Sequence, residues 1–567
     1  MTRTKGIWYE HTDKEKWTAE YPECSIFAQV KNNAQKYTDL PAVNFQNKTY
    51  SYKEFTEITE RLATALVALG LKKGDIVSIV SPNTPQAVFM FYAVNRIGAV
   101  ANMIHPLLSV KEIQHYIEQT ESSAVFVLDA VYDKISAVEW SLKKKPRIII
   151  ARVTDALPIY MKPLYRLKNR KRLVLNPCHD NIFWNDLLKL ADNSNAVLPP
   201  DTGKAEDLAV IIYTGGTTGI QKGAMFNNYS FTCYAIQTYE ASGLELTGKR
   251  CLAVLPLFHG FGIAFNVHAM LAGGACIYLV PVFDFNKCNA LIFKEKLNFL
   301  YGVPAFFEAL SRCPEMEKGD LSFMEALVSG GDVLSERLQK RINRQLEAGG
   351  AKAPIRNAYG LTESLTGCCI NPIFKNVIGS VGLPCPDMES KIVEIGTCTE
   401  VADGTDGELC LTGPILTMGY YKNEEATSQI LRKHDDGKIW LHTGDIFCKN
   451  EEEYLFFRQR IKRMIVSAGY NIYLSQAEVT VTECSIVKQC CAVGIEDAVL
   501  GSKLALYVIL NCEKDESEAA AVIMDFCREH FAEYSLPHKI IFVDEFPKTK
   551  MGKIDFRSLE DRINNRR

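Results

Sequence analysis

Apolar positions in the first part of the chain alternate between helical and extended periods. Between residues 52 and 69 the apolar side chains recur at spacings of three and four, which predicts a helix that ends at Gly70. Residues 75–80 then predict a strand, residues 86–96 the next helix, and residues 98–100 lead into another strand. This alternation predicts an α/β domain with a mostly parallel sheet.

An apolar run at residues 208–212 opens into the stretch IIYTGGTTGIQKG, which ends at Gly223 and predicts a strand followed by a glycine-rich loop. Its glycines allow backbone conformations closed to other residues and let N–H groups approach a ligand. Threonine hydroxyls and Lys222 add donors and a positive charge without an acid, which is typical of a polyanion site. The loop is not a Walker A P-loop, because Gly223 stands where that motif needs Ser or Thr. A plain turn between strands is the alternative.

Residues 251–283 contain no Asp, Glu, Lys or Arg, and such a segment is long enough to span a bilayer. Against a lipid-exposed helix stand Pro256, Pro281 and several glycines, together with the imidazoles of His259 and His268. We therefore expect a buried strand, helix and strand, with a membrane span as the alternative.

Three later strands are predicted to end in glycine and polar residues, at 327–332, 358–363 and 440–445. The second of these adds an aromatic residue and an acid, and the third presents a carboxylate beside a glycine. Asp-Gly pairs at 403–404 and 406–407 predict turns between short strands, so this part of the chain is predicted to be more antiparallel.

Basic residues at 458–462 follow an acidic turn and a strand, and they mark the predicted domain boundary. Beyond them the pattern predicts helices at 476–482 and 518–534 and strands at 487–493 and 504–510. This is a small α+β domain of about a hundred residues, a normal size for an independent unit. It closes with a polar loop at 546–555 that carries three lysines.

The chain has 567 residues, more than one hydrophobic core supports, so at least two domains are expected. A net charge of −3 provides no general field that attracts nucleic acid. The 18 cysteines include no CxxC pair and lie scattered through apolar stretches, which favours reduced thiols over disulfides or a zinc site. We expect a cytoplasmic protein without a secretory signal.

Basic residues concentrate between 143 and 172, beside the side chains of Ile159, Tyr160, Leu164, Tyr165 and Leu167. Because charge runs usually face water, a solvated surface insertion is one interpretation. The other is a peripheral contact with anionic lipid, which would suit an enzyme that takes lipid substrates.

The predicted loops together offer what an ATP molecule needs. The phosphates need donors, adenine needs a flat surface, and Mg²⁺ and the ribose hydroxyls need carboxylates. No nucleophile and base pair is apparent in the sequence. We therefore expect electrostatic catalysis of phosphoryl or nucleotidyl transfer.

Eight short segments occur in the order of the signatures of adenylate-forming enzymes, and the chain resembles that superfamily over nearly its whole length. They are YTGGTTGIQKG (213–223), LPLFH (255–259), YGLTE (359–363), GELCLTG (407–413), TGD (443–445), RIK (460–462), GYNIY (469–473) and PKTKMGK (547–553). The superfamily comprises acyl- and aryl-CoA synthetases, peptide-synthetase adenylation domains and firefly-type luciferases.

The resemblance implies a large N-terminal domain (1–459) of αβα layers with a distorted β-barrel subdomain, joined by a hinge to a small, mobile α+β domain (460–567). It also implies a two-step ligase that uses ATP, Mg²⁺ and coenzyme A. A carboxylate attacks the α-phosphorus of ATP and pyrophosphate leaves. A thiol then displaces AMP from the acyl-adenylate to give a thioester.

By the same resemblance, Lys553 would neutralise charge between the substrate carboxylate and the α-phosphate, and Lys462 would be the hinge. Glu363 and Thr214 would hold Mg²⁺. Tyr359 would stack on adenine, Asp445 and Arg460 would fix the ribose, and the thiol tunnel would lie near Gly469. The other residues expected at the nucleotide are Gly215, Gly216, Thr217, Thr218, Lys222, Gly330, Gly331, Asp332, Asn357, Ala358, Gly360, Leu361 and Thr362. The acid would lie against His259, Gly260, Phe265, Gly330 and Gly360.

Four of these residues also have a purely structural interpretation. Lys553 can be a solvated loop cation, Glu363 can cap a helix, and Asp445 can form a turn. His259 can be a core histidine instead of a gate between the acyl pocket and the thiol tunnel.

The sequence favours an acid–thiol ligase for a fatty or an aromatic acid. Residues 251–283 and 301–307 would wall an apolar pocket, and the former lacks the buried carboxylate that a free amino acid would need. One alternative is a ligase that loads a carrier-protein phosphopantetheine. Gly215 replaces the family's usual Ser and Gln221 a usual Pro, so an ATP-binding pseudoenzyme is another alternative. Leu474 also replaces a usual Pro. The expected assembly is a monomer or a homodimer.

Overall fold

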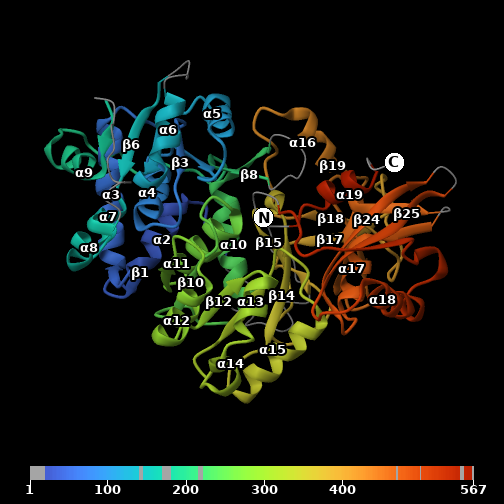
Figure 1. Cartoon of the computed structure of the whole chain (residues 1–567). Helices are drawn as coiled ribbons and strands as arrows, with labels where there is room; N and C mark the ends of the chain where they lie inside the picture. The colour runs from blue at the N-terminus through green and yellow to red at the C-terminus, as the bar shows by residue number, and fades with distance from the viewer. Residues whose placement is uncertain are drawn as a thin grey trace. The chain divides into compact units, whose positions relative to one another are not determined.

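The computed structural model describes residues 20–139, 145–168, 180–214, 221–467, 470–497, 500–548 and 554–564 (Figure 1). The chain divides into two compact units. The first comprises Met1–Glu389 and Thr412–Leu441, and the second comprises Ser390–Leu411 and His442–Arg567. The boundary that the sequence predicts between residues 459 and 460 remains a prediction.

One sheet of the first unit has seven strands in the order β7-β6-β5-β3-β4-β8-β9. The strands are β3 (Ile76–Val80), β4 (Val100–Ile104), β5 (Ala124–Leu128), β6 (Arg147–Ala151), β7 (Ile182–Phe183), β8 (Leu208–Tyr213) and β9 (Gly223–Asn227). Every neighbouring pair is parallel except β8 and β9, which form an antiparallel pair. Because parallel neighbours need a long crossover, helices alternate with the strands, as the periodicity predicts.

The helices of this part begin and end where the local sequence favours it. They are α2 (Ile26–Ala34), α3 (Tyr52–Ala68), α4 (Pro85–Arg96), α5 (Val110–Gln119), α6 (Tyr132–Glu139), α7 (Val153–Ala156), α8 (Lys162–Lys168), α9 (Trp184–Asn193) and α10 (Asn228–Ser242). A capping box between Ser51 and Glu54 starts α3, and Gly70 with a φ of 87° follows it. Thr84 caps α4 and every residue of α4 is buried, so this helix lies inside the unit.

A second sheet of the first unit has nine strands in the order β16-β15-β14-β13-β12-β10-β11-β1-β2. The strands are β1 (Pro41–Phe45), β2 (Lys48–Ser51), β10 (Arg250–Ala253), β11 (Cys276–Leu279), β12 (Phe299–Gly302), β13 (Ala326–Ser329), β14 (Ile355–Gly360), β15 (Gly367–Ile370) and β16 (Leu383–Pro384). The pairs from β14 to β1 are parallel, and the outer strands β2, β15 and β16 pair antiparallel. Accompanying helices are α12 (Phe285–Glu295), α13 (Pro304–Leu310), α14 (Pro314–Lys318) and α15 (Glu336–Ala348).

The uncharged segment forms a buried strand, helix and strand, and that prediction is confirmed. After β10 the chain continues as a π-helix (Phe261–Ala269), which runs directly into α11 (Met270–Ala272) and leads to β11. The imidazole of His268 is buried, and it contacts Gln29 Oε1 through Nε2 at 2.9 Å and the Tyr92 hydroxyl through Nδ1 at 3.2 Å. Among the described residues we find no helix with the length and hydropathy needed to cross a membrane.

Two further sheets have the strand orders β17-β18-β20-β19, with β21 paired to β20, and β23-β22-β25-β24, with β26 paired to β25. The strands are β17 (Glu389–Val393), β18 (Gly407–Thr412), β19 (Leu431–Lys433), β20 (Ile439–Lys449), β21 (Leu455–Arg460), β22 (Met464–Ser467), β23 (Tyr470–Tyr473), β24 (Val487–Asp497), β25 (Gly501–Leu510) and β26 (Lys539–Phe542). The helices are α16 (Glu424–Ile430), α17 (Leu474–Thr482), α18 (Glu516–His530) and α19 (Phe556–Asn564).

Strands β24 and β25 of the second unit separate two apolar cores. Ala492 and Leu506 pack into the core with residues of α17 and α18, whereas Val493 and Ala505 pack into the core with α19. Alternate residues of a strand face opposite sides, so one strand pair supplies both cores. The predicted fold class, α/β with a large N-terminal part and a small α+β C-terminal part, is confirmed.

Candidate functional site

The carboxyl ends of four neighbouring strands, β10, β12, β13 and β14, carry most of the predicted substrate and nucleotide residues. Ends of parallel strands meet at one edge of a sheet, where open α/β sheets bind ligands. Strand β10 leads into LPLFH, β12 into residues 301–307, β13 into Gly330, and β14 into LTE of YGLTE. Segments far apart in the sequence therefore lie along one edge.

Thr214 and Lys222 form the base of the β8–β9 hairpin that carries the glycine loop. The Thr214 N–H donates to the Lys222 carbonyl at 2.9 Å, and the Lys222 N–H donates to the Thr214 hydroxyl at 3.3 Å. The Gln221 N–H donates to the Tyr116 hydroxyl at 3.2 Å, a bond that the family's usual proline cannot make because it lacks the donor. The predicted residues Gly215, Gly216, Thr217 and Thr218 lie outside the described residues.

Tyr420 links the hairpin to the predicted magnesium ligand Glu363. The ammonium of Lys222 lies 4.9 Å from the centre of the Tyr420 ring, a cation–π distance, and the Tyr420 hydroxyl donates to Glu363 Oε1 at 2.5 Å. Burial, and then the Glu363 carboxylate, raises the pKa of Tyr420 far above its ordinary value, so the hydroxyl remains a donor. Tyr420 also forms a backbone bridge with Ala224 of β9. Glu363 therefore lies beside the hairpin.

Two predicted glycines are required by backbone contacts that the sequence does not reveal. A Cβ at Gly260 would lie 1.7 Å from the Leu365 carbonyl oxygen, and one at Gly360 would lie 1.9 Å from the Thr366 carbonyl oxygen. Only glycine allows such an approach. Both glycines meet the short segment that follows Glu363.

The remaining predicted nucleotide residues of the first unit follow β13 and β14. The Gly330 N–H donates to the Gly302 carbonyl at 3.0 Å, Gly331 has a φ of 77°, and exposed Asp332 accepts a hydrogen bond from the Val333 N–H. In and after β14, Asn357 and Thr362 are buried, whereas Ala358, Tyr359 and Leu361 are half-buried.

Aromatic side chains line the interior next to the β10 and β12 ends. The ring of Phe265 lies 4.4 Å from that of Tyr301, 5.5 Å from that of Phe261 and 6.1 Å from that of Tyr234. His259 is half-buried, and its Nδ1 accepts a hydrogen bond from the Phe261 N–H at 3.2 Å. This part of the unit is apolar and aromatic, as the uncharged segment predicts.

Arg356 is a charged residue that the sequence analysis missed. It lies in β14, is 2% exposed, donates to the Ala241 carbonyl at 3.1 Å and interacts electrostatically with Tyr301. Burial lowers its pKa below the ordinary value. No local pattern marks Arg356, because it lies near the start of β14, between polar and apolar residues that precede YGLTE.

The predicted ribose pair, Asp445 and Arg460, belongs to the second unit. The two residues are directly paired in β20 and β21, and Arg460 Nε lies 3.4 Å from Asp445 Oδ1. The Asp445 side chain is 6% exposed and the Arg460 side chain 63% exposed. The structure thus brings this pair together. Lys462 is exposed on the turn Ile461–Arg463, and Gly469 and Lys553 lie outside the described residues.

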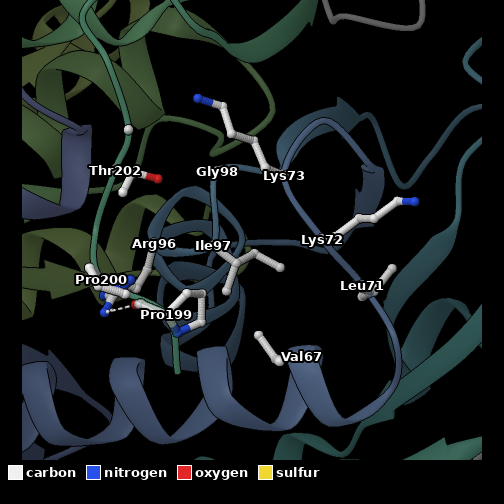
Figure 2. A pocket seen from close by; sticks show the side chains of 11 residues that line it. Val67, Leu71, Lys72, Lys73, Arg96, Ile97, Gly98, Pro199, Pro200 and Thr202 are labelled. Atoms are coloured by element: carbon white, nitrogen blue, oxygen red, sulfur yellow. Dashed lines mark hydrogen bonds between the residues drawn. The ribbon is translucent and has the colours of Figure 1, made fainter. Parts of the chain in front are cut away.

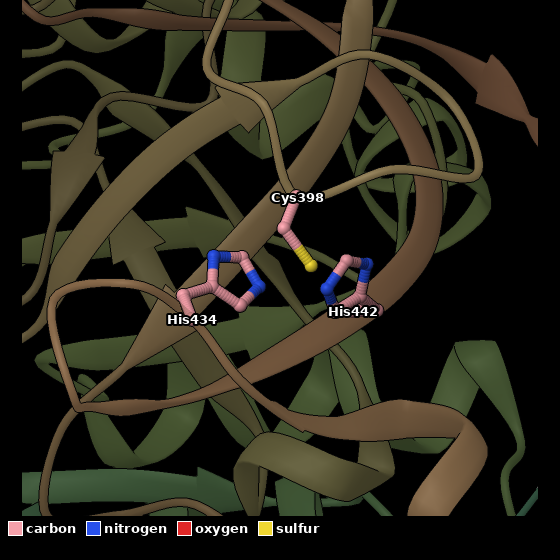
Figure 3. A group of neighbouring side chains, drawn as sticks. All are labelled: Cys398, His434 and His442. Carbon is pink, nitrogen blue, oxygen red and sulfur yellow. The ribbon is translucent and has the colours of Figure 1, made fainter.

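Glu408 contacts the part of β20 that precedes Asp445. Its Oε2 lies 2.9 Å from His442 Nδ1 and its Oε1 accepts a hydrogen bond from the Gly444 N–H at 3.0 Å. A ring nitrogen of His442 lies within 4.8 Å of the Cys398 sulfur, and Figure 3 shows both side chains. Glu408 belongs to GELCLTG, and its contacts with His442 and Gly444 could not be predicted from that motif.

A cavity of about 250 Å³ lies elsewhere in the first unit, between the end of α3, the end of α4 and residues 199–203 (Figure 2). Two of its cations have partners: Arg96 donates to the Pro199 carbonyl at 2.8 Å, and Lys73 pairs with Asp207 at 2.6 Å. None of the predicted site residues lines this cavity.

The fold is that of an α/β enzyme, and Lys222, Tyr420 and Glu363 lie together beside the β8–β9 hairpin. Family models match in two places: the AMP-binding enzyme model at residues 30–421 and the AMP-binding enzyme C-terminal domain model at residues 476–553.

Named relatives and solved structures cover almost the whole chain. A long-chain-fatty-acid–CoA ligase of Salmonella typhimurium is 30% identical, with 95% of this chain and 94% of the relative covered. One of Bacillus subtilis is 28% identical, with 96% and 97% covered. The ATP-bound structure of MatB from Rhodopseudomonas palustris shares the fold, with a TM-score of 0.81 at 23% identity over 95% of this chain and 99% of that one.

The chain belongs to the AMP-binding enzyme family. The resemblance to adenylate-forming enzymes of the acyl-CoA synthetase kind is thereby confirmed.

Proposed function

We propose that the protein activates a fatty acid with ATP and transfers the acyl group to coenzyme A, releasing AMP and pyrophosphate. The observation that carries the proposal is the contact chain from Lys222 through Tyr420 to Glu363, which sets a cation and a carboxylate at the base of the glycine loop. The names of the relatives in Salmonella typhimurium and Bacillus subtilis support a fatty acid as substrate and coenzyme A as acceptor.

In this proposal, donors of the glycine loop and Lys222 bind the phosphates of ATP. Glu363 and Thr214 fit Mg²⁺, because a carboxylate and a hydroxyl are the hard oxygen ligands that this ion prefers. When bound, the ion supplies charge neutralisation at the phosphates. Tyr420 holds the Glu363 carboxylate in place through its hydroxyl. Adenine stacks on Tyr359.

The acid lies against His259, Gly260, Phe265, Gly330 and Gly360, with its apolar part toward the aromatic rings. The cluster of Phe265 and Tyr301 supports an apolar acid, since such rings bury large apolar areas. The carboxylate is a poor electrophile until AMP gives it a good leaving group. A thiol then displaces AMP.

The second unit contributes the remaining groups. Asp445 accepts hydrogen bonds from the ribose hydroxyls, and Arg460, which lies 3.4 Å from it, helps to fix the ribose. Lys553 neutralises the charge that builds on the carboxylate and the α-phosphate, and its loss costs on the order of a hundred- to a thousandfold in rate. Lys462 is the hinge at which the small domain rotates between the two half-reactions. The domains of this proposal are residues 1–459 and 460–567.

The test is acid-dependent pyrophosphate release over a panel of fatty, aryl, steroidal and amino acids, with the wild type and the Lys553→Ala variant. Lys550→Ala, in the same loop, is the matched control. We expect turnover with fatty acids, a loss in Lys553→Ala and little change in Lys550→Ala. Thioester formation is measured with coenzyme A and with a carrier protein in parallel. If none of the acids in the panel supports pyrophosphate release, the proposal is wrong and an ATP-binding pseudoenzyme is favoured.

A further inference from the structure

A short amphipathic segment in the first unit exposes its apolar side chains. The 3₁₀ turn Ile159–Met161 continues into α8, and Ile159, Tyr160, Leu164 and Leu167 are 85%, 66%, 70% and 73% exposed. Tyr160, Leu164 and Leu167 are spaced by four and three residues, so they lie on one helical face. Met161, Lys162 and Tyr165, which lie around the rest of the helix, are only half-exposed. The apolar face therefore points to the outside.

This face is accompanied by positive charge. Lys162 and Arg166 are one helical turn apart, and neither makes an ion pair in the part of the chain that the structure describes. Burial, and then the charge of nearby Lys162, lowers the pKa of Lys48 in β2, although Glu54 opposes this effect. Cations that are not neutralised by a carboxylate leave a local positive field beside the apolar face.

We propose that residues 159–167 form a docking surface for a bilayer that contains anionic phospholipid. An exposed apolar stripe on a cationic segment complements such a surface, because the apolar side chains enter the headgroup boundary while exposed Arg166, about 100° around the helix from Leu167, meets lipid phosphates. Half-buried Lys162 adds to the attraction at longer range. Tyr160 suits the interface, since its ring is apolar and its hydroxyl polar. So short a stripe gives reversible attachment. The proposal does not depend on the substrate of the enzyme.

Co-sedimentation of the full-length protein with vesicles tests the docking surface. Vesicles of phosphatidylcholine alone are compared with vesicles that contain phosphatidylglycerol, at low and high salt. We expect binding to the anionic vesicles that weakens with salt. Each cation near the surface contributes about fivefold to partitioning, so Lys162→Glu with Arg166→Glu is expected to bind at least about 25-fold more weakly. Leu164→Glu with Leu167→Glu is expected to abolish sedimentation.

The matched control is Arg337→Glu with Arg344→Glu, which reverses two exposed charges on α15 of the same unit and is expected to bind like the wild type. Thermal unfolding and pyrophosphate release with a water-soluble acid verify that each variant is folded. Equal binding by the wild type and both patch variants would overturn the proposal, as would no binding to anionic vesicles. A wild-type dimer in light scattering that Leu164→Glu with Leu167→Glu dissociates would overturn it in favour of self-association.

Discussion

Replacing Tyr420 by phenylalanine removes a hydroxyl that donates to the Glu363 carboxylate from beside the glycine-loop hairpin. The aromatic ring stays, so the contact with Lys222 at 4.9 Å is retained, and only the 2.5 Å hydrogen bond to the carboxylate is lost. Tyr420 is 6% exposed, so bulk water has little access to take the place of the hydroxyl. The variant thus isolates the positioning of Glu363.

The size of the effect follows from the type of bond. A hydrogen bond to a charged group contributes about 1.5–3 kcal/mol, because the partner of a lost donor keeps its desolvation penalty. If the carboxylate position matters only in the transition state, this corresponds to a fall in kcat of about ten- to a hundredfold. The raised pKa of Tyr420 keeps its hydroxyl protonated at neutral and mildly alkaline pH, so we expect the same factor at pH 7 and pH 9.

The assay is pyrophosphate release at increasing Mg²⁺ concentration. We expect the Tyr420→Phe variant to need more Mg²⁺ for half-maximal rate, which a merely structural role would not produce. Tyr421→Phe is the matched control, because the Tyr421 ring faces Lys422 at 5.5 Å and its backbone bond to Gly223 does not involve the side chain. A Tyr420→Phe enzyme within twofold of the wild type at every Mg²⁺ concentration would show that Tyr420 does not position Glu363.

Three further outcomes are expected. Burial lowers the His268 pKa to about 3, so the unfolded chain takes up the proton first as pH falls below about 6.5. The free energy of unfolding measured with urea should therefore fall by about 2 kcal/mol from this group between pH 8 and pH 5, and His268→Gln should reduce this pH dependence. Gly360→Ala should destabilise the protein by about 1–3 kcal/mol, because its Cβ would lie 1.9 Å from the Thr366 oxygen; an unchanged melting temperature would contradict this. Asp445→Asn should raise KM for ATP about tenfold by weakening its contacts with the ribose and with Arg460, and an unaltered KM would remove the residue from the ribose site.

Much of the fold is a local property of the sequence. The helix predicted at 52–69 and the strand at 75–80 appear as α3 and β3, because the spacing of apolar side chains decides which face each element buries. The segments that carry chemistry, such as YGLTE, are likewise contiguous. Their residue types and order therefore indicate the family without any knowledge of contacts.

Other features depend on strand order, which the chain sets over long distances. Strands β10, β12, β13 and β14 lie side by side, and this order alone brings LPLFH, Gly330 and YGLTE to one edge. Tyr420 donates a hydrogen bond to Glu363, which lies 57 positions earlier in the sequence. Gln221 likewise donates to Tyr116, which lies 105 positions earlier. No spacing in the sequence marks such pairs.

The α/β class, the family and the identity of the chemical groups follow from the sequence alone, because periodicity and short motifs are encoded among near neighbours. Only the folded structure shows that Tyr420 donates to Glu363, that Gly360 must be glycine, that Arg356 is buried and that Leu164 and Leu167 face outward. Each of these features depends on contacts between segments that are distant in the sequence, and such contacts are fixed only when the folded chain packs.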